Sequence, residues 1–174
     1  RRAISLQADV RRKGDTQQMV EATVRQLGPL DILVCNAGVI NLSPVETMTE
    51  EAWDLTFAVN TKGIFLSCQA AIPALRARGD GCIINIASVA GKKGAPELAH
   101  YCASKFAVVG FTNALAKELA PANIRVNAIC PGFILTGLTK SPKVSTEQAG
   151  AHLDGLQPWP DHGTGNDIAG TVVY

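Results

Sequence analysis

Apolar and polar positions along the chain fall into blocks that predict strands and helices in alternation. Short apolar runs predict four strands, at residues 3–7, 32–35, 82–87 and 125–129. The first run leads to Asp9, and the second predicts a buried strand because all four of its residues are apolar.

Helical periodicity fills the interval after the first strand. We expect a helix that starts near Asp15, a candidate N-cap with Gln18 three residues later, and that ends at Gly28-Pro29. Its predicted apolar face comprises Val20, Val24 and Leu27.

Two longer helical regions follow. The first begins after Thr49, a candidate cap, and runs to about Arg76. The second spans residues 99–119 and is closed by Pro121. The predicted core face of the first includes Trp53, Phe57, Ile64 and Phe65.

Strands that alternate with helices predict an α/β fold with a parallel sheet covered on both faces. The 174 residues suffice for the core of one such domain. Ligands on parallel sheets bind at the carboxyl ends of the strands. Polar residues follow the predicted strand ends at Asp9, Asn36, Ser88 and Pro131, so we expect them at one rim.

Charge and composition exclude several function classes. Lys and Arg total 16 and Asp and Glu total 15, so no net field attracts nucleic acid or an anionic membrane. The sequence shows no signal peptide and no membrane-spanning run, which favours a cytoplasmic protein. The 5 cysteines are irregularly spaced, which favours free thiols over disulfides. The 3 histidines show no ligand spacing, so we expect no metal.

Tyr101 and Lys105 are the strongest candidates for chemistry. They lie four residues apart on a predicted helix and therefore share a face. A phenol with its ordinary pKa near 10 is a poor base, but a nearby ammonium favours the phenolate and would make Tyr101 a usable general acid/base. Such a pair alone is commonly a surface contact, so it indicates a catalytic site only in combination with neighbouring sequence motifs.

Those neighbours match a known family. Residues 85–136 contain N-I-A-S, Y-C-A-S-K and N-A-I-C-P-G-F-I-L-T, preceded by the turn Asn36-Ala37-Gly38 and by V-N-T at residues 59–61. This combination resembles the classical short-chain dehydrogenases/reductases, over about residues 3–136.

The resemblance implies an NAD- or NADP-dependent oxidoreductase that interconverts a secondary alcohol and a ketone, as a homodimer or homotetramer. Tyr101 would protonate or deprotonate the reacting oxygen, and Lys105 would lower the pKa of Tyr101 and hold the nicotinamide ribose. Ser88, thirteen residues before Tyr101, would hold the substrate oxygen. Asn60 would order a water that links Lys105 to solvent. Further implied cofactor contacts are Asp9, Val10, Asn36, Ala37, Gly38, Pro131, Gly132, Ile134 and Thr136.

Structural alternatives stay open for three of these positions. The Asn60 side chain could bond only a backbone carbonyl. The turn Asn36-Ala37-Gly38 could be a plain strand-ending turn, because Asn and Gly are ordinary turn residues. Asp9 could simply cap the segment that follows it.

The chain departs from the family pattern in two places. It contains no G-x-G-x-x-G loop, which in the family holds the pyrophosphate at a helix N-terminus. We therefore expect residues 1–174 to form a doubly wound, Rossmann-like domain that lacks the first two strands and first helix and binds nucleotide poorly by itself. Residues 138–165, the expected substrate lid, are the least family-like.

Two other functions remain open. The missing glycine loop favours a non-catalytic fragment or variant that keeps the fold and its oligomerisation surfaces. An epimerase or dehydratase on the same scaffold would also keep Y-x-x-x-K. The four filled catalytic positions favour the oxidoreductase, with a polyol, diol, sugar, steroid or 3-oxoacyl thioester as substrate.

Overall fold

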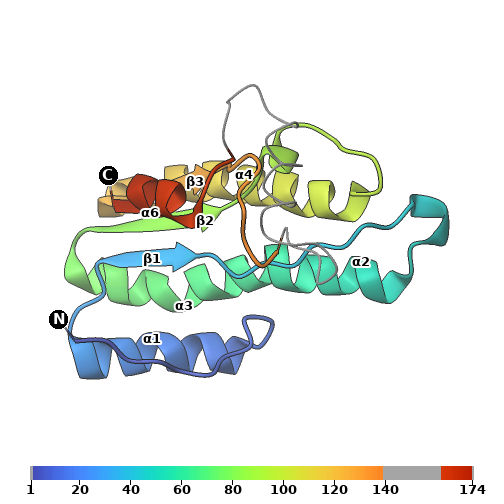
Figure 1. Cartoon of the computed structure of the whole chain (residues 1–174). Helices are drawn as coiled ribbons and strands as arrows, with labels where there is room; N and C mark the ends of the chain where they lie inside the picture. The colour runs from blue at the N-terminus through green and yellow to red at the C-terminus, as the bar shows by residue number, and fades with distance from the viewer. Residues whose placement is uncertain (1, 139–161, 174) are drawn as a thin grey trace.

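The computed structural model describes residues 2–138 and 162–173, and in them three strands form a parallel sheet in the order β1-β2-β3 (Figure 1). The strands are β1 (Ile32–Cys35), β2 (Gly81–Ile86) and β3 (Ile124–Ile129). Cys35 lies opposite Asn85 and Ile86 opposite Ile129, so the carboxyl ends of all three strands share one rim. The predicted parallel α/β sheet is confirmed, with β2 beginning one residue earlier than expected.

Helices connect the strands in the alternating order of a Rossmann-type fold. They are α1 (Lys13–Leu27), α2 (Glu50–Phe57), α3 (Gly63–Arg78), α4 (Ala99–Leu119) and α6 (Gly165–Val173). The π-helix η2 (Ala58–Lys62) joins α2 to α3, and the short 3-10 helices are η1 (Val45–Thr47), η3 (Val89–Gly91) and η4 (Ala120–Ala122). Thr49 caps α2 as predicted, because its hydroxyl accepts from the Ala52 N–H.

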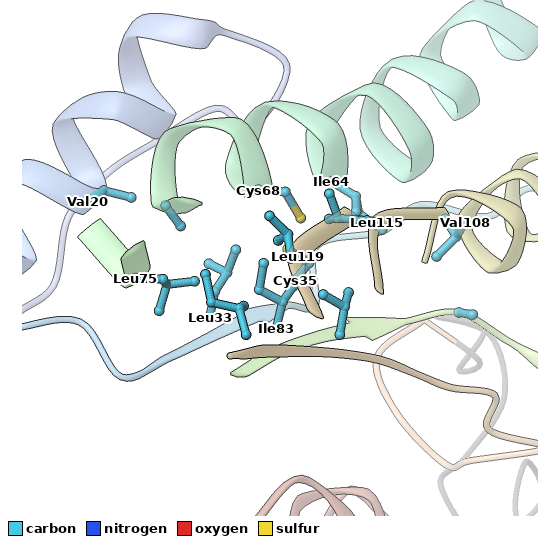
Figure 2. Close-up of a cluster of buried hydrophobic side chains, with 14 residues drawn as sticks. Val20, Leu33, Cys35, Ile64, Cys68, Leu75, Ile83, Val108, Leu115 and Leu119 are labelled. Carbon is cyan, nitrogen blue, oxygen red and sulfur yellow. The ribbon is translucent and has the colours of Figure 1, made fainter. Parts of the chain in front are cut away.

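The main core lies between the sheet and helices α3 and α4, with α1 packed on α3 (Figure 2). Leu75, Ile83 and Leu119 lose all exposure there. Burial of a side chain of this size stabilises the fold by about 1.5–3 kcal/mol relative to leaving it in water. This core fixes α4, which carries Tyr101 and Lys105, against the sheet.

The predicted strand at residues 3–7 is wrong. The segment is not in a strand, because no described strand pairs with it and an isolated strand leaves its backbone groups without a ladder. It runs alongside α1, where the Arg2 guanidinium donates to the carbonyls of Gln26 and Leu27 at 3.4 Å each (Figure 1).

The start of α1 also differs from the expectation. The helix begins at Lys13 with Arg12 in the capping position, so Asp15 lies inside the first turn and is not the N-cap. Its carboxylate accepts from the Asp9 N–H at 2.8 Å, and a negative charge there is favoured by the helix dipole. The helix ends before Gly28, as predicted. The φ of 107° at this residue is a backbone conformation that glycine adopts without strain.

Several residues expected in the core are exposed. Strand β1 is buried on one face only, since Ile32 and Val34 are 53% and 41% exposed in the described structure. The predicted core face of α1 is wrong at Val24, and that of the helical region after Thr49 is wrong at two aromatic residues. The residues concerned, Val24, Trp53 and Phe65, are all more than a third exposed. Their faces carry apolar side chains that no described element covers.

Two further expectations concern membranes and the substrate lid. No helix among the described residues is long and apolar enough to cross a bilayer. Of the predicted lid at residues 138–165, residues 139–161 lie outside the described part of the chain. The thiols of all 5 cysteines are free.

Candidate active site

Tyr101 and Lys105 lie on one face of α4, near the rim where the three strands end. Both side chains are buried, with exposures of 7% and 4%. The Lys105 Nζ lies 5.7 Å from the centroid of the Tyr101 ring. The predicted pairing of these residues on one helix face is therefore present in the structure.

Lys105 is held by the last residue of β2. Its Nζ donates to the Ile86 carbonyl oxygen at 2.9 Å, which uses one of the three N–H donors of the ammonium. Burial lowers the pKa of Lys105 from its ordinary 10.5 to about 8, although the nearby Cys130 thiol acts in the opposite direction. The side chain is a buried cation with donors to offer a ligand.

The pKa of Tyr101 is raised, and not lowered as the sequence suggested. Burial of the phenol raises the pKa, a hydrogen bond with Ser88 opposes that shift, and Cys102 adds to it. The ammonium of Lys105 donates to the Ile86 carbonyl and is not among the groups that shift the pKa of Tyr101. Because its pKa is raised above the ordinary value of 10, the phenol of Tyr101 is protonated at neutral pH.

Ser88 links two strand ends to Tyr101. It is the N-cap of η3, where its Oγ accepts from the Ala90 N–H at 3.1 Å, and its side chain is near enough to Tyr101 to lower the pKa of the phenol. The Val89 N–H donates to the Pro131 carbonyl at 2.8 Å. These bonds bring the turns that follow β2 and β3 together beside the phenol, as the sheet topology predicts.

A close backbone contact fixes η3 on α4. A Cβ built on Gly91 would lie 2.7 Å from the Lys105 carbonyl oxygen and 3.2 Å from Val109 Cγ2. Real Cβ atoms essentially never approach a backbone oxygen so closely, so only glycine fits here. Gly91 therefore sets the distance between the Ser88 turn and the helix that carries Lys105.

Asn60 is fully buried in the π-helix η2, a feature often found at functional sites. Its Oδ1 accepts from the Val39 N–H at 2.8 Å, and its Nδ2 donates to the Val39 carbonyl at 3.0 Å. The structural alternative expected a bond to a backbone carbonyl alone, and the amide has in addition a bond from Nδ2 to the Ser104 hydroxyl at 3.1 Å. The water relay to Lys105 stays a prediction.

The turn Asn36-Ala37-Gly38 lies beside these groups. A Cβ on Gly38 would sit 3.5 Å from Asn60 Oδ1 and 3.7 Å from Lys105 Nζ. The glycine thus borders the space in front of the ammonium. Asn36 and Ala37 are exposed at the carboxyl end of β1.

The other predicted cofactor residues lie at separate points. The Asp9 carboxylate accepts from the Arg11 side chain at 2.6 Å and from the Arg11 N–H at 3.0 Å, so it holds the turn before α1. Arg11 lowers the pKa of Asp9 to about 2. A Cβ on Gly63 would lie 2.8 Å from Val10 Cγ2, which places Val10 against the start of α3.

The segment after β3 completes the set. Pro131 and Gly132 follow β3 directly, and Ile134 forms a parallel bridge with Gly163 just before α6. Thr136 is half-buried, and its hydroxyl accepts from the Leu138 N–H at 3.3 Å.

The residues present fit the nicotinamide-ribose half of NAD or NADP better than its phosphates. Lys105 offers cationic N–H donors, and Gly38 leaves space in front of them. The sequence has no G-x-G-x-x-G loop to hold a pyrophosphate.

Sequence reasoning missed several groups that shape the site. They are the Ile86 carbonyl that holds Lys105, the Ser104 hydroxyl that bonds Asn60, and Gly91. Ser104 stands inside the motif Y-C-A-S-K, and Gly91 follows N-I-A-S by three residues. Ile86 binds Lys105 through its backbone carbonyl, which every residue type has, so the sequence could not indicate this contact.

The buried ammonium predicts a pH dependence of stability. Because the folded-state pKa of Lys105 is about 8 and its ordinary value 10.5, the fold disfavours the charged form. The penalty, about 3 kcal/mol, is fully present below pH 8 and is relieved as pH rises toward 10.5. In the full-length natural protein, the free energy of unfolding should therefore increase between pH 8 and 10.5, and in the Lys105→Met variant this increase should be absent. The same pH dependence of the free energy of unfolding in both proteins from pH 7 to 10.5 would contradict this prediction.

Comparison with known proteins gives consistent matches. A family model described as short chain dehydrogenase matches residues 1–146. The 3-oxoacyl-[acyl-carrier-protein] reductase FabG of Staphylococcus aureus is 37% identical over 172 residues, which are 99% of this chain and 69% of that protein.

Solved structures show the same similarity. A short-chain type dehydrogenase/reductase from Mycobacterium marinum matches with a TM-score of 0.89 and 34% identity, over 98% of this chain and 67% of that one. A structure described as ElxO with NADP bound matches with a TM-score of 0.88 and 28% identity, over 96% and 68% of the two chains.

Proposed function

The chain belongs to the short-chain dehydrogenase family and is an NAD- or NADP-dependent oxidoreductase acting on CH–OH and keto groups, and from this premise we propose that Tyr101 is its general acid/base. In this proposal the enzyme interconverts a secondary alcohol and a ketone. Ser88 binds the reacting oxygen, and Lys105 binds the nicotinamide ribose.

One observation carries the proposal: the Tyr101 phenol is buried at the strand-end rim, with Ser88 near enough to lower its pKa and Lys105 on the same helix face. A carbonyl oxygen placed between the two hydroxyls would receive one hydrogen bond from Ser88 and a proton from Tyr101. Both donors are held before substrate arrives, which reduces reorganisation in the transition state.

The bound nicotinamide supplies the hydride, and the residues of this chain supply position and the proton. Because the pKa of Tyr101 is raised, the phenol carries its proton at neutral pH and is ready to act as the acid in ketone reduction. Alcohol oxidation needs the phenolate. The Lys105 ammonium, when it bonds the ribose, brings positive charge toward the phenol and favours that form. Asn60 is proposed to order the water through which Lys105 exchanges protons with solvent.

The cofactor contacts are proposed at two places. Asn36, Ala37 and Gly38 line the adenosine side, with Asp9 and Val10 contacting the adenine. Pro131, Gly132, Ile134 and Thr136 flank the nicotinamide. Asp9 also holds its own turn, because its carboxylate accepts from Arg11 and its N–H donates to Asp15.

The substrate is proposed to be a small ketone or its alcohol, with a 3-oxoacyl thioester as the first candidate. Support comes from the Staphylococcus aureus relative, which is a 3-oxoacyl-[acyl-carrier-protein] reductase. A reductase among the relatives also favours hydride transfer over an epimerase or a dehydratase. Family membership and the four filled catalytic positions favour an enzyme over a non-catalytic variant. A homodimer or homotetramer remains a proposal from the family resemblance.

The test is ketone-dependent oxidation of NADH and NADPH by the full-length natural protein, with a panel of a 3-oxoacyl thioester, a diketone, a sugar and a steroid ketone. We expect turnover of at least one ketone, and a loss of about 10- to 1000-fold in kcat for Ser88→Ala, which removes a donor to the reacting oxygen. Reduction should slow as pH rises through the pKa of Tyr101, and oxidation of the alcohol should accelerate. No turnover with any ketone, or full activity of Ser88→Ala, would refute the proposal.

A further inference from the structure

Ser104 is a buried serine in the middle of the catalytic helix, and its hydroxyl bonds to two different elements. It is fully buried and lies between Tyr101 and Lys105 in sequence, on α4. Its Oγ donates to the Tyr101 carbonyl at 2.7 Å and accepts from Asn60 Nδ2 at 3.1 Å. A buried serine that satisfied only its own helix would need the first bond alone.

The bond from Asn60 extends this contact to the turn in front of Lys105. Asn60 holds the backbone of Val39 by two hydrogen bonds, one to its N–H and one to its carbonyl. Val39 directly follows Gly38, which borders the Lys105 Nζ. A continuous path of short hydrogen bonds therefore runs from the catalytic helix to the turn that faces the ammonium.

We propose that Ser104 is a positioning residue that, through Asn60, sets the turn at residues 36–38 at the correct distance from Lys105 for the cofactor to bind. This rests on the proposed function, in which the turn lines the adenosine side of the dinucleotide and Lys105 binds its nicotinamide ribose. Ser104 has no contact with the substrate and acts only through Asn60.

The geometry distinguishes the hydroxyl from the rest of the residue. The Thr61 hydroxyl also binds Ser104, but at the backbone carbonyl, at 3.3 Å. Substitution of the side chain leaves that bond in place. Loss of the hydroxyl therefore releases the Asn60 amide from α4 without detaching the π-helix from it.

The experiment compares two buried serines in the full-length natural protein. Ser67 is 5% exposed, and its hydroxyl donates only to the Gly63 carbonyl on its own helix, at 2.8 Å. The dissociation constant is measured by fluorescence for NADH or NADPH, whichever the unaltered protein binds more tightly. We expect Ser104→Ala to weaken binding about 3- to 10-fold, the cost of one lost hydrogen bond, with kcat changed less than about twofold. Ser67→Ala should bind as the unaltered protein does.

Two outcomes count against the proposal. Equal cofactor affinity in Ser104→Ala and Ser67→Ala overturns the role of Ser104 while leaving Tyr101 as the acid/base. An unchanged affinity with a reduced kcat also overturns it, because the hydroxyl would then serve Tyr101 and not the turn. If Ser104→Ala does not fold, Ser104→Cys is measured in its place, because its thiol has similar size but accepts the Asn60 N–H more weakly; cofactor affinity equal to that of Ser67→Ala would then overturn the proposal. Retained turnover in Tyr101→Phe would instead overturn the proposed function, so the two failures are distinguishable.

Discussion

Replacing Tyr101 with Phe is expected to reduce ketone-dependent NADH or NADPH oxidation by at least about 100-fold, because positioned proton transfer contributes about 100- to 10000-fold to such reactions. The substitution removes the phenol oxygen, which carries the proton, and keeps the buried ring, which is 7% exposed. The measurement is the initial rate of cofactor oxidation at saturating ketone in the full-length natural protein.

The ring and the ammonium provide the control for this variant. Lys105 keeps its bond to the Ile86 carbonyl, so the affinity for cofactor should stay within about threefold of the unaltered protein. A variant that binds cofactor normally and turns over normally would show that the proton comes from another group. A variant that loses both binding and turnover would indicate a structural role for the phenol.

Replacing Gly91 with Ala is expected to damage both stability and activity. The new Cβ would lie 2.7 Å from the Lys105 carbonyl oxygen and 3.0 Å from its carbonyl carbon, so η3 or α4 must move. Overpacking of this kind costs about 1–3 kcal/mol. The same movement separates Ser88 from the catalytic helix, and we expect kcat/KM to fall about 10- to 100-fold. Thermal unfolding and steady-state kinetics measure the two effects.

Gly94 is the matched control, three residues further along the same loop. A Cβ at Gly94 meets nothing within 4 Å, so Gly94→Ala should retain both stability and kcat/KM. Equal behaviour of the two variants would contradict the packing account of η3. A Gly91→Ala protein that is destabilised but fully active would show that the distance between Ser88 and Lys105 tolerates the shift.

The sequence predicted most of the fold, because local patterns determine most of it. Helix α4 has the expected bounds, since an unbroken apolar periodicity ends at Pro121. The failures came where a segment depends on partners elsewhere. Residues 3–7 have strand composition, but a strand exists only with a neighbouring ladder. Likewise Ile32 and Val34 have the composition of buried strand residues, yet burial depends on what covers the sheet.

The site was predictable as a set of residues and not as a set of contacts. Motif spacing placed Ser88, Tyr101 and Lys105 together, and the structure brings them to one rim. The sequence could not reveal that Lys105 donates to a backbone carbonyl or that the Asn60 amide hydrogen-bonds the backbone of Val39. The direction of the Tyr101 pKa shift was wrong for the same reason, because burial and the orientation of an ammonium are three-dimensional properties.

Isotope transfer tests the central claim most directly. The full-length natural protein is given a ketone that it reduces and a cofactor with deuterium at both hydrogen positions of nicotinamide C4, and the alcohol is analysed by mass spectrometry. The account predicts one deuterium on the carbinol carbon of each product molecule, formed at least about 100-fold more slowly by Tyr101→Phe. Alcohol without deuterium, or deuterium transfer at an undiminished rate in Tyr101→Phe, would contradict it.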